Sequence, residues 1–174
     1  MNSTRVPRLH QGAMVAMLWL CAIIGVQASE APAGTHQEKI TMTRHATGHF
    51  DVKLVPLAAD EGRDSPIGRM SNDKQFHGDL DATSMGQMLM LGTAVKDSAA
   101  YVSIEVVKGR LHGREGSFAL HHNGVMDRGG GTLDIRVVPD SGTDALTGLT
   151  GKLDITIVDG RHLYDFHYAL PEAP

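Results

Sequence analysis

The sequence predicts an all-β protein that forms a single antiparallel barrel of about eight strands. Between Tyr101 and Tyr168, short stretches that alternate apolar and polar residues are separated by glycine-centred turns. This pattern is typical of consecutive antiparallel strands. No amphipathic helix long enough to cover a sheet is evident, so the sheet has to close into a barrel or fold into a sandwich to protect its edges. Eight strands suit a barrel whose interior is filled or holds one small ligand.

The first 28 residues have the pattern of a secretory signal peptide. Arg5 and Arg8 precede the uncharged stretch 13–26, and small residues around Ala28 form a cleavage site. The apolar stretch is shorter than the ~20 residues that a membrane-spanning helix needs, which makes an uncleaved anchor the less favoured alternative. We therefore expect a protein that is exported to the periplasm or beyond the cell and is free of the membrane after cleavage.

Cleavage after Ala28 leaves 146 of the 174 residues, which is the size of one domain. We expect residues 29–39 to form a flexible leader and residues 40–172 to form the barrel. Loss of the two signal arginines takes the formal net charge from −4 to −6, so a basic surface for nucleic acid is not expected. Cys21, the only cysteine, lies in the signal, and the mature chain therefore has no disulfide.

The elements before the long alternating run are predicted from shorter patterns. In order, they are a strand at 47–57, a charged loop at 58–68, a strand at 69–83 and a strand at 87–95. In the first strand, Phe50, Val52 and Leu54 alternate with polar residues, which indicates a half-buried strand. Residues 87–95 are rich in Met and Leu and also suit a helix, but their short length and the neighbouring glycines favour a strand.

The later strands follow the alternating run. They are predicted in YVSIEVVKGRLHG, REGSFALHHNGVM, GGTLDIRVVP, KLDITIV and RHLYDFHYAL, with the loop DSGTDALTGLTG before the last two. The glycines of 128–132 lack the helix and lysine of a phosphate-binding loop, and we interpret them as a hairpin turn. Ser117 is expected to make local hydrogen bonds rather than to act as a nucleophile.

Two segments of this run resemble a known protein family. They are SIEVVKGRLHGREGSFALH, within 102–121, and VVPDSGTDALTGLTG at 137–151, with weaker similarity at ATGHFDVKL and FHGDL. They resemble a bacterial family of unknown function whose members have the allene oxide cyclase-like barrel. The resemblance implies that fold, and by analogy with the plant cyclases an apolar interior able to hold a small molecule. It implies no catalytic residues, because the catalytic motif of those cyclases is not visible here.

Glu105 stands on a predicted strand with two chemically different faces. One face is polar and the other is wholly apolar: Tyr101, Ser103 and Glu105 against Val102, Ile104 and Val106. If the polar face points into the barrel, the carboxylate is desolvated, its pKa rises, and it suits proton transfer. If the apolar face packs instead, Glu105 is solvated. We favour the surface position for Glu105.

Hairpin pairing through Gly113 is expected to bring Glu105 beside residues 121–123. Glu105 and His121 are therefore the candidate catalytic residues, and Asn123 is a candidate ligand contact. The last strand adds an aromatic column of Tyr164, Phe166 and Tyr168, which forms either core or pocket wall. The predicted ligand-binding set is Tyr101, Ser103, Glu105, His121, Asn123, Tyr164, Phe166 and Tyr168.

Ten histidines raise the question of a metal site. His121 and His122 are adjacent and face opposite sides of a strand, and His162 and His167 also face opposite ways because an odd number of residues separates them. A site assembled from different strands, such as His77 with His121 and His167, is not selected by any spacing. We predict no metal site and no cofactor.

Three functions remain open on the sequence alone. The favoured one is binding of a small apolar or amphipathic molecule inside the barrel. The first alternative is a cofactor-independent isomerase or cyclase that uses Glu105 in the lumen. The second is a filled barrel that self-associates through Val102, Ile104 and Val106 to form a homo-oligomer.

Overall fold

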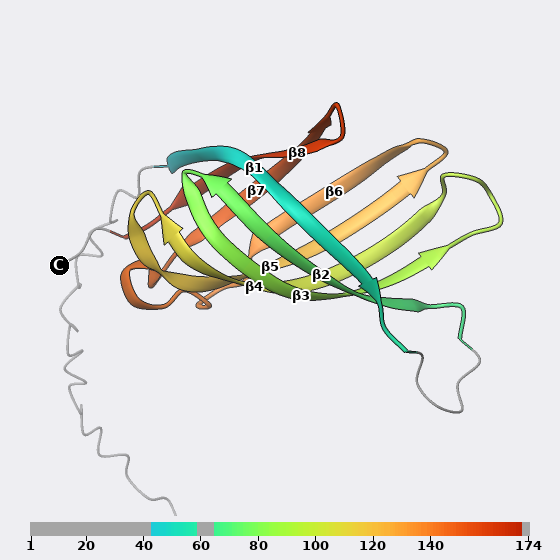
Figure 1. The fold of residues 1–174 in the computed structure, drawn as a ribbon, viewed down its shortest axis with the longest axis horizontal. Coiled ribbons are helices and arrows are strands. Elements are labelled where there is room, and N and C mark those ends of the chain that lie inside the picture. The colour runs from blue at the N-terminus through green and yellow to red at the C-terminus, as the bar shows by residue number, and fades with distance from the viewer. Residues whose placement is uncertain (1–42, 59–64, 172–174) are drawn as a thin grey trace, which may run out of the picture. The chain divides into compact units, whose positions relative to one another are not determined.

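The computed structural model describes residues 43–58 and 65–171, and within them eight strands form one closed antiparallel barrel in chain order (Figure 1). The elements are β1 (Thr43–Pro56), β2 (Gly68–Gly78), β3 (Leu80–Gly92), β4 (Ala99–Leu111), β5 (Arg114–Asp127), β6 (Gly130–Val137), the short 3₁₀ helix η1 (Asp144–Leu146), β7 (Thr150–Val158) and β8 (Arg161–Ala169). The predicted all-β barrel of about eight strands is confirmed. The predicted signal peptide 1–28 and leader 29–39 lie outside the described residues, as do residues 59–64 of the charged loop. No helix in the described part of the chain is long and apolar enough to span a membrane.

The barrel closes where β1 pairs with both β2 and β8. In Figure 1 the two ends of the coloured chain, β1 in cyan and β8 in dark red, run side by side. At this seam Phe50 of β1 lies opposite Phe76 of β2 and opposite His162 of β8. Closure leaves no free sheet edge at this seam, which is the usual way for an antiparallel sheet without covering helices to avoid edge-to-edge association.

The junction between β6 and β7 is the weakest part of the wall. A single residue pair, Arg136 and Lys152, joins the two strands there. The loop 138–149 lies against β5 instead: the Thr143 backbone N–H donates to the Ser117 carbonyl (2.9 Å), and the two side-chain hydroxyl oxygens lie 3.0 Å apart. Ser117 does form hydrogen bonds, but its partner Thr143 is 26 residues away and not local as expected. The loop satisfies strand groups that β6 leaves without a partner.

The predicted single strand at 69–83 is wrong, because the chain turns at Gly78 and Asp79 and forms two strands. Gly78 has a φ of 112°, which a residue with a side chain rarely adopts. The turn is held by tertiary contacts: the Asp79 carboxylate accepts from the Thr47 N–H (2.8 Å), and the Tyr164 hydroxyl accepts from the Leu80 N–H (2.9 Å). Phe76 and Leu80 both point inward, so the alternation of apolar and polar residues continues through the turn. The sequence pattern alone therefore does not indicate that a strand ends there. The predicted strand at 87–95 is the second half of β3, which ends at Gly92.

One half of the barrel interior is packed solid. This half extends from the level of Glu105 to the end that carries the turns at Gly78 and Gly113 and the loop 138–149. Its fully buried side chains include Phe76, Leu80, Leu111, Phe118, Leu120, Ile135, Leu146, Leu149, Phe166 and Tyr168. The rings of Phe118 and Phe166 stack across the interior with centroids 5.7 Å apart. This packing provides the rigid floor on which the candidate site is built.

Candidate functional site

A buried charged cluster lies in the middle of the barrel. The Glu105 carboxylate of β4 accepts hydrogen bonds from the Lys74 ammonium of β2 (2.5 Å), the Ser84 hydroxyl of β3 (2.6 Å) and His122 Nε2 of β5 (2.9 Å). Because an ionised carboxylate only accepts, His122 must carry its hydrogen on Nε2. The side chains of Lys74, Glu105 and His122 are 6 %, 1 % and 4 % exposed, respectively. Four neighbouring strands thus each contribute one side chain to a single compact network.

Opposing effects set the pKa of Glu105. Burial by itself raises it, but the hydrogen bond from His122 and the charge of Lys74 outweigh burial and lower the pKa from its ordinary value of 4.5 to about 2. The carboxylate is therefore ionised at neutral pH. With the Lys74 ammonium beside it, the pair is neutral, and any positive charge on His122 makes the cluster net positive.

Gly86 makes room for this cluster on the adjacent strand. It lies directly opposite Glu105 in the ladder between β3 and β4, and a methyl group at this position would overlap the Asn72 amide and the Glu105 side chain. The Asn72 amide donates to the Ser103 hydroxyl (3.0 Å), which in turn donates to the Gln87 carbonyl (3.0 Å). Asn72 Oδ1 is buried and has no hydrogen-bond partner among the described residues. A ligand or solvent molecule with a donor group could satisfy this acceptor.

The other half of the barrel interior, which lies on the opposite side of the charged cluster from the packed half, is hollow. The cavity has a volume of about 290 Å³, and we call it the cup. Its apolar lining comes from Val52, Leu54, Met88, Met90, Met126 and Ile155, and polar groups of Asn72, Lys74, Tyr101 and His122 are also part of its wall. Mostly apolar lining with a few directed polar groups is the usual composition of a small-molecule site, and the volume lies near the lower limit of the ~300–1,000 Å³ range of such sites. Methionine side chains adapt their shape to different ligands.

Tyr101 occupies one wall of the cup. Its ring lies over Gly124, its cross-strand partner, where an added methyl group would overlap the ring. Burial, and then the nearby Glu105 carboxylate, raise the pKa of the Tyr101 hydroxyl above its ordinary value of 10.0. At neutral pH the hydroxyl is therefore protonated and can donate a hydrogen bond to a ligand.

Comparison with known proteins places this chain in a family. Residues 46–168 match the family described as "Protein of unknown function (DUF3224)". The chain belongs to the DUF3224 family. A solved structure of a DUF3224 protein from Shewanella oneidensis MR-1 is 46% identical in sequence, with a TM-score of 0.69, and the match covers 75% of this chain and 100% of that one. No curated protein matches the chain.

The DUF3224 barrel corrects the expected surface position of Glu105. Glu105 is 1 % exposed, whereas Val102, Ile104 and Val106 are 52 %, 62 % and 52 % exposed and form the outer face of β4. Apolar residues normally determine which face of a strand is buried, and here they do not. The barrel buries the polar face because Lys74, Ser84 and His122 compensate the carboxylate, and these partners lie on other strands.

The other predicted site residues separate into three groups. Tyr101 and Ser103 lie with Glu105 on the inner face of β4. His121 and Asn123 point outward, because the adjacent His122 takes the inward position opposite Ser103. The predicted approach of residues 121–123 to Glu105 is thus made through His122 and not through His121.

The aromatic column of β8 belongs to the packed half of the barrel rather than to the cup. The Tyr164 hydroxyl holds the turn at Leu80, Phe166 stacks on Phe118, and the Tyr168 hydroxyl lies 2.7 Å from His112 Nδ1. Sequence reasoning missed Lys74, His122 and the methionines of the cup. The sequence did contain one indication of this site: Asn72 and Lys74 are separated from Phe76 by even numbers of residues. These two polar residues therefore point to the same, inward face of β2 as Phe76.

Proposed function

We propose that this DUF3224 protein binds a small amphipathic molecule in the cup. The observation that carries the proposal is an apolar cavity of about 290 Å³ above a buried charged cluster, in a barrel whose other half is tightly packed. A hollow half is costly to maintain in a small domain, because filling it with larger side chains would add buried apolar area. At roughly 30 Å³ for a molecule the size of water, the cup holds on the order of ten non-hydrogen atoms.

The position of the polar groups indicates how such a ligand is oriented. Its polar group lies toward Lys74 and His122 at the charged end of the cup, and its apolar part contacts Met88, Met90 and Met126. The Lys74 ammonium already contacts Glu105, so the charged end of the cup is neutral or positive rather than negative. A small neutral or anionic polar group therefore fits better than a cation.

The enzyme alternative is weakened by the state of Glu105. A general base works best when its pKa lies near the working pH, and the pKa of Glu105 is lowered to about 2. The carboxylate also already accepts hydrogen bonds from three different side chains. These features suit a structural anion that orients Lys74 and His122, and they favour binding over proton transfer by Glu105.

Titration with straight-chain carboxylates of increasing length, from butanoate to dodecanoate, tests the proposal by calorimetry. We expect one binding site and an affinity that rises by roughly fourfold per methylene, which corresponds to ~0.8 kcal/mol, until the tail fills the cup. The matching alcohols test the contribution of Lys74 and His122, since they have the same tails as the carboxylates but lack the charge.

Two methionine variants on the same strand provide the control. Met90→Trp places a large ring in the cup, whereas Met85→Trp changes an outward residue that is 75 % exposed. We expect Met90→Trp to weaken binding at least about tenfold and Met85→Trp to leave it unchanged. Absence of binding for the whole carboxylate and alcohol series, or equal loss in both variants, would show that the cup is not the site.

Self-association is a second candidate function, because the outer face of β3 and β4 carries an exposed apolar patch. The patch consists of Met85, Leu89, Val102, Ile104 and Val106, which neighbour one another across the ladder between these strands. A patch of this kind is typical of an interaction surface. We expect sedimentation velocity to detect a dimer of the wild-type protein that Ile104→Glu disrupts. Thr156→Glu, which changes an exposed residue on the outer face of β7, should leave the dimer intact. A monomeric wild-type protein would exclude self-association.

We also propose that the protein is exported. The support is the amino-terminal pattern of Arg5 and Arg8, the uncharged stretch 13–26 and the small residues before Ser29. N-terminal sequencing of protein from the periplasmic or culture fraction of its host should begin at Ser29. Recovery of a chain that begins at Met1 would contradict the proposal.

A further inference from the structure

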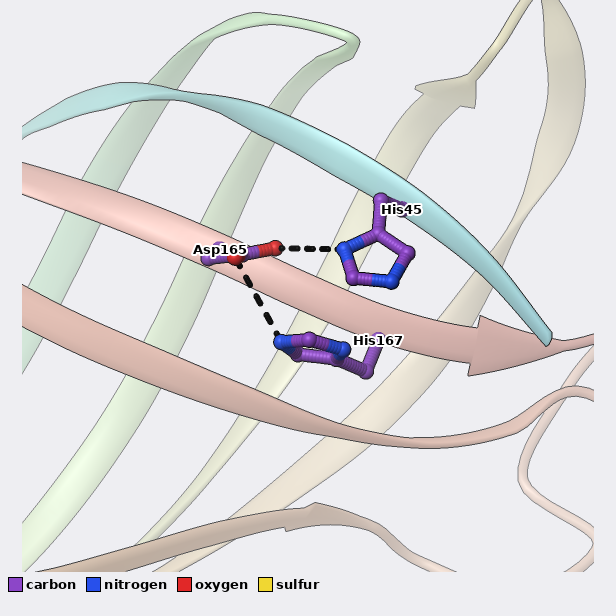
Figure 2. A group of neighbouring side chains, drawn as sticks. All are labelled: His45, Asp165 and His167. Atoms are coloured by element: carbon purple, nitrogen blue, oxygen red, sulfur yellow. Dashed lines mark ion pairs between the residues drawn. The ribbon is translucent and has the colours of Figure 1, made fainter.

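Two histidines and a carboxylate meet on the outer wall of the barrel, at the seam where β1 joins β8. Asp165 and His167 are two residues apart on β8 and point outward, and His45 lies directly opposite His167 on β1. Figure 2 shows both imidazole rings turned toward the Asp165 carboxylate. The ring centroids of His45 and His167 are 4.1 Å apart in an edge-to-face arrangement. One potential ligand atom from each residue lies within 4.8 Å of the other two.

These distances suit a metal ion. The His45 Nδ1 and His167 Nε2 atoms each lie 3.4 Å from a different oxygen of Asp165. Ligands bound at ~2.0–2.1 Å around one tetrahedral ion lie about 3.4 Å from each other. The two histidine nitrogens lie within 4.8 Å of each other, and the His45 side chain is 57 % exposed, which gives its ring room to move toward a shared ion. We propose that His45, Asp165 and His167 bind a divalent transition metal ion such as Zn²⁺.

The electrostatics of the same region call for a cation. Asp165 Oδ1 is buried and makes no hydrogen bond within the described part of the chain. Asp154 of β7 lies directly opposite Asp165, and like charges facing each other across a sheet are destabilising. Lys152 contacts Asp154 (2.7 Å) and compensates that carboxylate, which leaves Asp165 to be neutralised from the side of the two histidines.

Two imidazoles and one carboxylate are ligands that Zn²⁺, Co²⁺, Ni²⁺ and Cu²⁺ accept, whereas Mg²⁺ and Ca²⁺ prefer oxygen ligands alone. Three protein ligands leave at least one coordination position for water or another molecule. This proposal departs from the sequence-based expectation of no metal site. That expectation rested on histidine pairs that face opposite sides of one strand and on the lack of any spacing that selects a site from different strands. Here His45 lies on another strand, 122 residues before His167 in the chain. It stands independently of ligand binding in the cup, which opens inside the barrel.

Calorimetric titration of the metal-free protein, prepared without a histidine tag, tests the proposal. We expect one Zn²⁺ per chain, and Co²⁺ should give the intense visible absorption of a tetrahedral site. His45→Ala and His167→Ala should each weaken Zn²⁺ binding by more than the ~10–100-fold that loss of an outer-shell partner costs. Asp165→Asn keeps the shape of the side chain, removes its charge and should also weaken binding.

The matched control is His121→Ala, which removes an outward histidine on β5 and should leave binding unchanged. Thermal unfolding of each variant establishes that it is folded, and Zn²⁺ should raise the melting temperature of the wild-type protein and of His121→Ala but not of His45→Ala. Absence of Zn²⁺ and Co²⁺ binding to the wild-type protein, or unchanged affinity in both His45→Ala and His167→Ala, would overturn the proposal.

Discussion

Replacing Glu105 with glutamine tests what holds the centre of the barrel together. The substitution preserves shape but leaves the Lys74 ammonium, which is 6 % exposed, without its counter-charge. Breaking a buried ion pair in this way typically costs ~3–5 kcal/mol. The lowering of the Glu105 pKa from 4.5 to about 2 gives a similar figure of about 3 kcal/mol, at ~1.4 kcal/mol per pH unit. We therefore expect Glu105→Gln to lower the free energy of unfolding by ~3–5 kcal/mol, a large share of the ~5–15 kcal/mol typical of a domain.

The same substitution should change the pH dependence of stability. Because folding lowers the pKa of Glu105, its contribution is fully present above the unfolded-state value near 4.5 and is lost as the pH falls to about 2. The wild-type protein should lose about 3 kcal/mol from this group across that interval. Glu105→Gln has no carboxylate at this position and should lack that part of the acid dependence.

Urea denaturation followed by far-ultraviolet circular dichroism at several pH values measures both effects. Glu115→Gln is the matched control, because that side chain is 78 % exposed and lies 3.8 Å from Arg110; we expect a change within ~0.5 kcal/mol. Replacing both members of the buried pair, Lys74→Met with Glu105→Leu, should recover much of the stability lost in Glu105→Gln. A loss below about 1 kcal/mol in Glu105→Gln, or an unchanged acid dependence, would show that the Lys74–Glu105 pair does not stabilise the barrel.

Two further predictions concern the geometry around the cluster. Gly86→Ala should lower the free energy of unfolding by ~1–3 kcal/mol, because its methyl group overlaps the Asn72 amide. Gly92 has open space around it in the described structure, so Gly92→Ala should change the free energy of unfolding by less than ~0.5 kcal/mol. Equal effects of the two variants in urea denaturation would contradict this prediction. Tyr164→Phe should cost ~1–3 kcal/mol because it leaves the Leu80 N–H without its acceptor, and hydrogen exchange of that amide should become faster; an unchanged exchange rate would show that the turn does not depend on the hydroxyl.

Much of the fold was predictable because strand patterns are local. The alternation at Phe50, Val52 and Leu54 identified β1, and the glycine turns after Tyr101 identified most of the later strands. The turn at Gly78 was missed because its two flanking strands keep the same inward phase across it. Its stabilising contacts come from β1 and β8, which are distant in the chain.

The candidate site was only partly predictable. Glu105 was singled out because it lies on a strand with one polar and one wholly apolar face, and Tyr101 and Ser103 were correctly placed on its face. The β4–β5 hairpin was expected to bring residues 121–123 beside Glu105, but His121 was chosen there instead of His122. Lys74 was not connected to Glu105, because its approach from β2 depends on the register of β2, β3 and β4 together.

Local patterns in the amino-acid sequence are enough to establish that this chain is built from antiparallel strands and which residues alternate on each of them, since a period of two is set by the backbone of a single strand. Which face of β4 is buried depends instead on contacts with the other strands of the folded barrel. Closure of β1 onto β8 brought His45 to Asp165 and His167, and the packing of one half of the interior left the other half hollow. These outcomes depend on contacts between residues far apart in the chain, whose energies no local pattern contains.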